Sequence, residues 1–308
     1  MSGPPLPRFV PNPDRPVYGE TPRPEWLKVR LVDNEDTRGI LDLVRRKHLN
    51  TVCQEAQCPN IFECWGRERT ATFMLMGDVC TRRCGFCAVT QGIGRPLDPE
   101  EPRHVAEAVK ELGVRHAVVT SVNRDELPDG GAAHFAATIG AIRAANPGVT
   151  VEVLIPDFLG SEAALRTVLE AAPEVLNHNT ETVPRLYRKA RPGGRYPRAL
   201  ELLDRARRYA PHIPTKSGLM VGLGEEWNEI VSTLADLRGV GCGILTIGQY
   251  LSPSSAHLPV ARYYHPEEFE MLKSTALSMG FGHVESGPLV RSSYHAHEQA
   301  DSYERMAR

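Results

Sequence analysis

The sequence predicts an α/β fold in which parallel strands alternate with helices. Short apolar runs, typical of buried strands, recur along the chain, and stretches with apolar residues at helical spacing separate them. Six such strands are expected, at residues 70–76, 116–122, 150–155, 175–176, 218–221 and 244–247. Because a helix follows each strand, the strands should run parallel with right-handed crossovers. The pattern does not decide whether the sheet opens doubly wound or curls toward a barrel.

Three of the helices are indicated by the spacing of their apolar residues. The first lies at residues 36–48 and ends in basic side chains, which the helix dipole favours at that end. The other two carry the stripes Val105, Ala108, Val109, Leu112 and Ile230, Leu234, Leu237. The first 26 residues are rich in proline and arginine without periodicity, so we expect an extended arm there.

The charge and hydropathy of the chain argue against two classes of partner. Its 308 residues carry 36 Lys and Arg against 38 Asp and Glu, a net charge of -2, which disfavours nucleic-acid binding through overall charge. No apolar run approaches the roughly 20 residues of a membrane span. The N-terminus lacks the charged and then apolar layout of a secretory signal. We therefore expect a soluble, cytoplasmic protein that binds neither nucleic acid nor membrane.

Seven cysteines are present, and six of them fall between Cys53 and Cys87. This clustering argues against disulfides spread through a secreted fold, and it favours thiols that stay reduced and bind metal. The seventh, Cys242, lies between two glycines at the edge of an apolar run. Because free cysteine is among the most buried residue types, we expect Cys242 to be a buried structural thiol.

Cys80, Cys84 and Cys87 form a C-x3-C-x2-C pattern on a loop directly after the first expected strand. Such short spacing holds three soft thiolate ligands together, which favours zinc or iron–sulfur chemistry over hard cations. Four thiolates close a metal site, whereas three around a four-iron cluster leave one iron open to a substrate or cofactor. A zinc knuckle and a redox C-x2-C pair are the alternatives for this pattern alone.

Cys53, Cys58 and Cys64 form a second set of three, spaced C-x4-C-x5-C. Alone, this set would suit zinc equally well. Two consecutive sets of three indicate two iron–sulfur clusters, each short of one cysteine ligand. That combination is far more restrictive than either set.

The first cysteine set, with Phe86 before its last cysteine, resembles the signature of radical S-adenosylmethionine enzymes. The segment around Cys58 and Cys64, together with Arg-Ser-Ser-Tyr at residues 291–294, resembles the lipoyl synthase family within that superfamily. This resemblance implies a partial (βα)6 barrel, similar to a TIM barrel, at residues 70–282, with its site at the C-terminal ends of the strands. Residues 1–69 would form an N-terminal extension carrying the auxiliary-cluster cysteines, and residues 283–308 a C-terminal tail.

The resemblance also implies the cofactors and their ligands. One 4Fe–4S cluster would bind S-adenosylmethionine at its open iron and cleave it, with one electron, to a 5'-deoxyadenosyl radical. A second, auxiliary 4Fe–4S cluster would take the Ser293 oxygen as its fourth ligand. The implied metal ligands are Cys80, Cys84 and Cys87 for the first cluster, and Cys53, Cys58, Cys64 and Ser293 for the second. Of these, Cys80, Cys84, Cys87 and Ser293 are expected to be catalytic.

The implied reaction inserts two sulfur atoms at carbons six and eight of an octanoyl chain on a lysine of a lipoyl-carrier domain or of H-protein. Two molecules of S-adenosylmethionine would be used, and the auxiliary cluster would give up its sulfides. The implied partners are the octanoylated carrier, an electron donor such as ferredoxin or flavodoxin, and an iron–sulfur carrier protein that rebuilds the auxiliary cluster.

Polar residues and glycines on or after several expected strands are candidates for contacts with S-adenosylmethionine. The set is Thr120, Asn179, Glu181, Lys216, Gly222, Glu225 and Gln249. Gly222 and Glu225 belong to a G-x-apolar-x-G-x-x-E run that resembles the adenine-contact motif of the superfamily. Each polar residue alone equally fits a helix cap or a loop anchor. His178 has no evident carboxylate partner, and we expect it to donate or accept hydrogen bonds rather than act as a general base.

Residues 185–208 hold nine Lys or Arg against only Glu201 and Asp204. Such a run is either a solvated helical face or a docking patch for an acidic protein partner. Two other functions stay open on the sequence. Another sulfur-inserting or methylthio-transferring radical enzyme would share the Cys80 loop without the tail, and a non-enzymatic zinc or iron–sulfur scaffold would leave the glycine run unexplained.

Overall fold

The computed structural model describes residues 23–28, 35–55, 58, 60, 61, 64, 72–294, 296, 298 and 299. Most of the arm predicted for the first 26 residues lies outside these ranges. Within them the chain begins with a short 3-10 helix, η1 (Glu25–Leu27).

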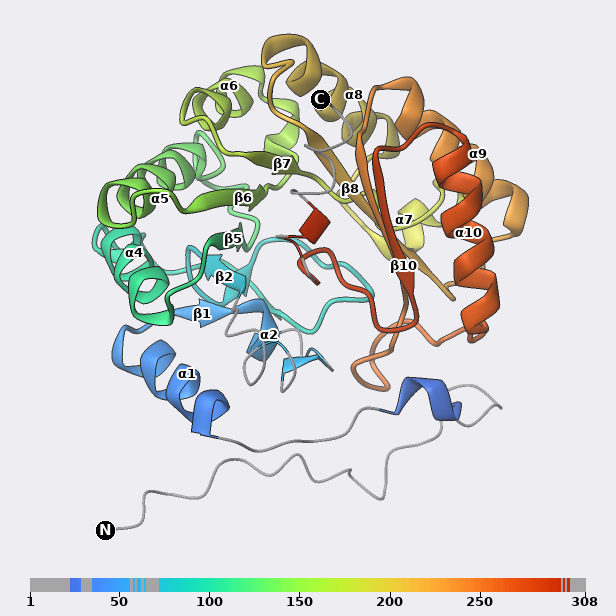
Figure 1. The fold of residues 1–308 in the computed structure, drawn as a ribbon, viewed down its shortest axis with the longest axis horizontal. Coiled ribbons are helices and arrows are strands. Elements are labelled where there is room, and N and C mark those ends of the chain that lie inside the picture. The colour runs from blue at the N-terminus through green and yellow to red at the C-terminus, as the bar shows by residue number, and fades with distance from the viewer. Residues whose placement is uncertain are drawn as a thin grey trace.

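All six predicted strands are present, and they form one parallel sheet that curls into a barrel (Figure 1). They are β2 (Thr72–Leu75), β5 (His116–Ser121), β6 (Thr150–Leu154), β7 (Val175–Asn177), β8 (Thr215–Val221) and β9 (Ile244–Gln249). Two further strands extend the sheet: β10 (His283–Gly287) pairs parallel with β9, and β1 (Asn50–Thr51) pairs antiparallel with β2. Within the described part of the chain β1 and β10 do not pair with each other, so the barrel is partial.

The longer helices cover the outside of the sheet, whereas the short α2 (Val52–Glu55) and α7 (Tyr187–Ala190) lie inside that ring (Figure 1). In chain order the longer helices are α1 (Glu35–Arg46), α4 (Glu101–Leu112), α5 (Ala132–Ala145), α6 (Glu162–Glu170), α8 (Tyr196–Tyr209), α9 (Trp227–Gly239) and α10 (Pro266–Ser278), with short 3-10 turns η2 (Phe158–Gly160) and η3 (Pro184–Leu186). The three predicted helices correspond to α1, α4 and α9. Among the described residues no helix is long and apolar enough to cross a membrane.

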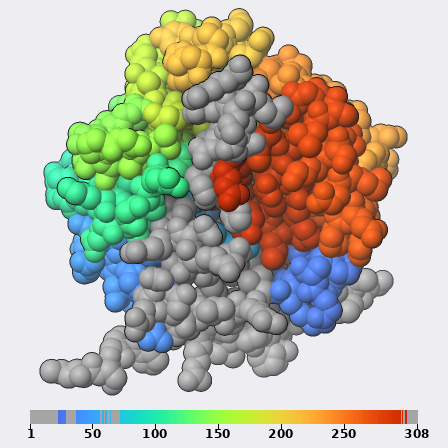
Figure 2. All heavy atoms as spheres, viewed as in Figure 1, coloured from blue at the N-terminus to red at the C-terminus, as the bar shows by residue number. Residues whose placement is uncertain are grey.

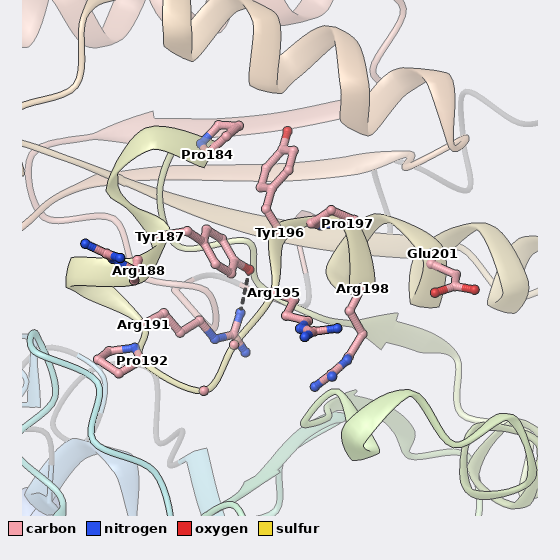
Figure 3. Close-up of a pocket in the computed structure, with 12 residues that line it drawn as sticks. Pro184, Tyr187, Arg188, Arg191, Pro192, Arg195, Tyr196, Pro197, Arg198 and Glu201 are labelled. Carbon is pink, nitrogen blue, oxygen red and sulfur yellow. Dashed lines mark hydrogen bonds between the residues drawn. The ribbon is translucent and has the colours of Figure 1, made fainter.

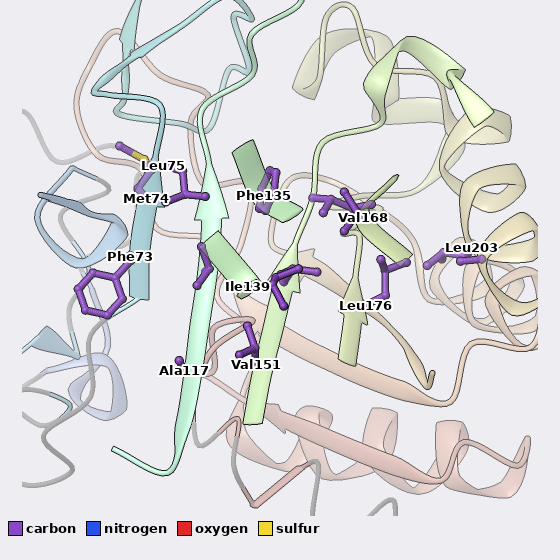
Figure 4. Close-up of a cluster of buried hydrophobic side chains, with 14 of the residues drawn as sticks. Phe73, Met74, Leu75, Ala117, Phe135, Ile139, Val151, Val168, Leu176 and Leu203 are labelled. Carbon is purple, nitrogen blue, oxygen red and sulfur yellow. The ribbon is translucent and has the colours of Figure 1, made fainter. Parts of the chain in front are cut away.

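The hydrophobic core lies between the strands and this outer layer of helices. Figure 4 shows Phe135 and Ile139 of α5 beside Val151 of β6, and Leu176 of β7 toward Leu203 of α8. Cys242 belongs to this core and is fully buried, with its thiol donating to the carbonyl of Ile244 at 3.3 Å. The prediction that Cys242 is a buried structural thiol is therefore confirmed.

A buried ion pair fills part of the barrel interior. Because successive side chains of a strand point to opposite faces, Glu152 points away from the face that Val151 and Val153 give to the helices. The ammonium of Lys216 on β8 donates to both carboxylate oxygens of Glu152, at 2.8 and 3.0 Å, and both side chains are buried. Burial alone would raise the pKa of the Glu152 carboxyl, but the Lys216 charge and the His116 hydrogen bond outweigh it, and the pKa lies below its ordinary value.

This pair gives a stability prediction. Lys216→Met leaves the Glu152 carboxylate buried without its cation and should lower the free energy of unfolding by about 3–5 kcal/mol. The double variant Lys216→Met with Glu152→Gln buries no ionised pair and should recover more than half of that loss. Anaerobic urea unfolding of the two variants measures both values. A single variant as stable as the original protein would show that the pair does not hold the barrel interior.

Candidate active site

The first cysteine set lies on a loop that follows β2 and begins at β3 (Val79–Cys80), which pairs parallel with β4 (Thr90–Gln91). Two backbone amides donate to the Cys80 sulfur, those of Asn123 at 3.3 Å and Arg82 at 3.5 Å. A turn closed by the Cys87 amide and the Cys84 carbonyl, 3.1 Å apart, brings the second and third cysteines together. All three cysteines therefore lie on the segment that begins at β3 and ends before β4.

The electrostatics of this loop suit a cationic cluster. The pKa of Cys84 is raised to about 12, chiefly by burial; the Arg191 guanidinium opposes this rise, and the nearby Cys87, Glu181 and Cys80 contribute to it. Burial likewise raises the pKa of Cys87. Three thiolates can lie together in such a setting only with compensating positive charge, which iron or another metal supplies.

Polar atoms without a protein partner lie at the strand ends around this loop. The described residues give no hydrogen-bond partner to Ser121 Oγ, Asn123 Oδ1, His178 Nε2 or Asn179 Oδ1, all of them buried. A buried polar atom without a partner is costly, so these atoms fit a polar cofactor such as S-adenosylmethionine.

Arg82, between the first two cysteines, fixes the loop to two strand ends. Its guanidinium is buried and donates from Nε to Asp125, which follows β5, at 2.8 Å, and from Nη2 to Asp157, which follows β6. Asp157 is itself paired with Arg198 of α8 at 3.1 Å. Burial alone would raise the pKa of the Asp157 carboxyl, but its bond to Arg82 outweighs burial and holds the pKa well below the usual range.

Residues after β7 form another part of this site. His178 is buried, and its Nδ1 lies 2.8 Å from the carbonyl oxygen of Ile155. Because a carbonyl oxygen can only accept a hydrogen bond, Nδ1 must be the donor. That bond confirms the predicted hydrogen-bonding role. Burial lowers the pKa of His178 to about 3, and the nearby Arg191 acts in the same direction. Burial raises the pKa of Glu181, and the Arg191 guanidinium, which donates to the Asn179 carbonyl at 2.6 Å, opposes that rise.

The second cysteine set lies beside the C-terminal tail. Cys53 is buried on α2, and the Cys58 amide donates to the Cys53 carbonyl at 3.1 Å. The side chain of Asn60 donates to the Leu289 carbonyl of the tail at 2.7 Å, and the amide of Cys64 donates to the Asn60 carbonyl. Burial raises the pKa of Cys58, and the guanidinium of Arg291 is close enough to lower it in part.

The two serines of the tail contact different parts of the barrel. Ser293 accepts a hydrogen bond from the Thr72 hydroxyl of β2 at 2.7 Å, and Ser292 accepts one from the Asn179 amide group, also at 2.7 Å. Figures 1 and 2 show the described part of the tail, in red, in the middle of the barrel face. The tail thus joins the auxiliary cysteine segment to the site after β7.

Comparison with known proteins identifies the family. The family model of the Radical SAM superfamily matches residues 74–237. A lipoyl synthase of Rubrobacter xylanophilus is 59% identical over 96% of this chain and 92% of its own length. A lipoyl synthase of Caldanaerobacter subterraneus is 57% identical over 89% of this chain and 95% of its own length. The chain belongs to the lipoyl synthase family.

Two solved structures share the fold of this lipoyl synthase family member at low sequence identity. HydG, a maturase of the FeFe-hydrogenase, superposes with a TM-score of 0.55 at 14% identity, over 75% of this chain and 62% of HydG. Streptococcus suis SuiB bound to its precursor peptide SuiA gives a TM-score of 0.53 at 10% identity, over 81% of this chain and 52% of SuiB. The predicted partial barrel of the superfamily is therefore confirmed. Membership of the lipoyl synthase family implies the cofactors S-adenosylmethionine and 4Fe–4S clusters.

Several residues predicted to contact S-adenosylmethionine have partners within the protein itself. Lys216 binds Glu152, and the Thr120 hydroxyl donates to the Leu154 carbonyl at 2.8 Å. The Glu225 carboxylate accepts the amides of Gly222 and Leu223. Gln249 accepts the amide of Tyr264 and donates to the Arg262 carbonyl, and a side-chain carbon at Gly222 would lie 2.1 Å from its Nε2 atom. Contacts of all seven residues with the cofactor stay predictions. Of the remaining two, Glu181 lies close enough to Cys84 and Cys87 to raise their pKa values, and the Asn179 carbonyl accepts from Arg191.

Sequence reasoning missed two residues of the lipoyl synthase site. Arg82 was not singled out, although an arginine between two ligand cysteines is an unusual place for a solvated charge. Arg191 was placed in the basic run, yet its side chain is buried beside Asn179 and Tyr187. The Pro-Gly-Gly that follows Arg191 is the one local indication that this arginine is not part of a solvated helical face, because it ends α7 and leaves Arg191 at a turn.

The buried imidazole of His178 predicts a pH dependence. Because its pKa is about 3 when folded and about 6.5 when unfolded, the unfolded chain takes up the proton first as pH falls. The free energy of unfolding should therefore fall by about 1 kcal/mol between pH 7.5 and 5.5 through this residue alone. Urea unfolding at both pH values should show this part of the slope missing in His178→Gln. Equal slopes for the two proteins would show that His178 is not held neutral.

Proposed function

We propose that this chain inserts two sulfur atoms at carbons six and eight of an octanoyl group carried on a lysine of a lipoyl-carrier domain. The auxiliary cluster is the sulfur donor in this proposal. The observation that supports it most directly is that the serine tail bonds to both the auxiliary segment and the barrel. Asn60 donates to the Leu289 carbonyl, and Ser293 accepts from Thr72 of β2, the strand that leads to the Cys80 loop. The chain is also more than half identical to lipoyl synthases.

The proposal gives each cysteine set its own cluster. Cys80, Cys84 and Cys87 hold the cluster that binds S-adenosylmethionine, and the remaining set holds the auxiliary cluster together with Ser293. Bound clusters and cofactor supply the one-electron chemistry that an unactivated C–H bond requires, while the protein supplies position and excludes water. An alkoxide is a harder and less usual iron ligand than a thiolate, so the Ser293 bond should be the first to release.

Two charged groups beside the cysteine loop suit the amino-acid end of S-adenosylmethionine. The buried Arg191 guanidinium interacts with Cys84 and can neutralise the cofactor carboxylate. Glu181 interacts with Cys84 and Cys87 and can accept from the cofactor amino group. Asn179 contributes an unpaired Oδ1 between them. The other five predicted contacts would then act indirectly, by fixing the conformation of the strand ends. They are Thr120, Lys216, Gly222, Glu225 and Gln249.

The remaining parts of the proposal concern partners and domain limits. The auxiliary cluster must be rebuilt by an iron–sulfur carrier protein, and ferredoxin or flavodoxin would supply electrons. Thiols that must stay reduced favour the cytoplasm. We keep the division into an extension at residues 1–69, a barrel at 70–282 and a tail at 283–308, with β10 as the part of the tail that joins the sheet.

The reaction is tested by an anaerobic assay with an octanoylated carrier domain, S-adenosylmethionine and a reductant. Mass spectrometry of the carrier should show a gain of two sulfur atoms, and the reconstituted protein should contain about eight irons per chain. Replacing Cys80, Cys84 and Cys87 together by alanine should leave about half of the iron and abolish 5'-deoxyadenosine formation. Zinc as the dominant metal, or a methylthio group on the carrier, would contradict the proposal.

The role of Ser293 can be separated from its hydrogen bond to Thr72. Ser293→Ala should keep S-adenosylmethionine cleavage and reduce lipoyl formation at least about a hundredfold, the scale of a lost metal-site interaction. Thr72→Val removes only the donor to Ser293, and Ser292→Ala removes the other serine. Both controls should stay within about tenfold of the original rate. A Thr72→Val defect as large as that of Ser293→Ala would assign Ser293 a structural role instead.

A further inference from the structure

An open cleft of about 650 Å³ lies between η3, α7 and the start of α8. Arginines dominate its charged lining, namely Arg188, Arg191, Arg195 and Arg198, against the single acid Glu201. Figure 3 shows Arg191, Arg195 and Arg198 extending to the same side of the chain, with Arg188 apart from them. We call this feature the arginine cleft.

The arginines of the cleft differ in whether their guanidinium groups already bind another group of the protein. Arg191 is buried and donates to the Asn179 carbonyl, and Arg198 is paired with Asp157. Arg188 and Arg195 are exposed, and within the described residues neither forms an ion pair. Arg185, from the same basic run, is bound at 2.7 Å by Glu229 outside the cleft. Among the residues that line the cleft, the available positive charge is therefore concentrated at Arg188 and Arg195.

The first turn of α8 adds to this positive potential. Arg195 is its N-cap, and no side chain caps the helix there. The exposed amides at the start of a 14-residue helix carry the positive end of the helix dipole. Pro197 in the first turn has no amide hydrogen, so the side chains of Arg195 and Arg198 are the principal donors toward the cleft.

The floor of the cleft touches the cysteine loop directly. The Gly85 amide, one residue after Cys84, donates to the Ala190 carbonyl of α7 at 2.8 Å. At Gly193 an added side-chain carbon would lie 3.9 Å from the Arg82 side chain. A macromolecule that bound at the arginine cleft would therefore lie beside the loop that carries the first cluster.

We propose that the arginine cleft is the surface on which the lipoyl-carrier domain docks, through carboxylates that flank its octanoyl-lysine. The proposal rests on the proposed function and names the enzyme surface that recognises its protein substrate. A cleft with two exposed, unpaired arginines at its rim is complementary to an acidic protein surface, and such rim charges mainly raise the rate of encounter. Its place beside the cysteine loop lets the modified lysine reach the barrel while the carrier body stays outside.

The test measures association of an octanoylated carrier domain with the reconstituted holoenzyme by stopped-flow fluorescence. The double variant Arg188→Glu with Arg195→Glu should lower the association rate constant at least about tenfold at low salt and flatten its salt dependence. Dissociation should change less. Cleavage of S-adenosylmethionine without carrier should be unchanged, because neither residue contacts the cysteine loop.

A matched control carries the same change in net charge elsewhere on the surface. Arg166 and Arg208 are exposed and already paired with Glu162 and Asp204, so the double variant Arg166→Glu with Arg208→Glu should associate within about twofold of the original protein. If association slowed equally in both double variants, the effect would come from the change in net charge alone, and the proposal would be overturned. Unchanged association of the Arg188→Glu and Arg195→Glu double variant at low salt would likewise overturn it.

Charge exchange on the carrier provides the second arm. Replacing the acidic residues that flank its octanoyl-lysine by lysine should slow association with the original enzyme and restore it with the Arg188→Glu and Arg195→Glu variant. No restoration would place the docking surface elsewhere. If the original enzyme binds the carrier through the cleft but adds no sulfur, the proposed function fails while the docking surface stands.

Discussion

The buried guanidinium of Arg82 is the contact on which the placement of the cysteine loop depends. Few β-sheet hydrogen bonds hold the loop, because its two strands, β3 and β4, contain only two residues each. Three backbone bonds to the rest of the barrel add to these: the Thr81 amide donates to the Asn123 carbonyl at 3.0 Å, the Gly85 amide to the Ala190 carbonyl at 2.8 Å, and the Leu258 amide to the Gly85 carbonyl at 2.8 Å. Ion pairs from Arg82 to Asp125 and Asp157 tie the loop to the ends of two neighbouring strands. The register of the parallel sheet therefore determines where the three sulfurs lie.

The opposite edge of the sheet places the tail by the same principle. β10 pairs in register with β9, from His283 opposite Ile244 to Gly287 opposite Gly248. The chain then crosses so close to β9 that a side-chain carbon at Gly248 would lie 2.1 Å from the Val290 carbonyl. This crossing carries Ser292 and Ser293 from the sheet edge to Asn179 and Thr72. The cysteine loop after β2 and the serine tail after β10 are thus both positioned by strands of one sheet.

The strands and cysteine sets could be predicted because their signals are local: a buried run, or thiols a few residues apart. β10 was missed because its side chains alternate between buried and partly exposed, with His283 and Glu285 on the wetter face. The partners of Arg82 lie 43 and 75 residues away, which no spacing rule reports. The pairing of Lys216 with Glu152, two strands away, likewise follows no local pattern, although a buried ammonium needs a carboxylate. Sequence patterns identify an element and its chemistry, whereas pairing across the barrel follows from tertiary packing.

The central claim of this account is that the two cysteine sets hold different clusters, of which only one binds S-adenosylmethionine. Electron paramagnetic resonance of the reduced protein tests it most directly, on two variants that each keep one cluster. With Cys53, Cys58 and Cys64 replaced by alanine, addition of S-adenosylmethionine should change the spectrum, because the open iron gains a ligand. With Cys80, Cys84 and Cys87 replaced, the remaining signal should not respond. A response in the second variant, or none in the first, would contradict the assignment.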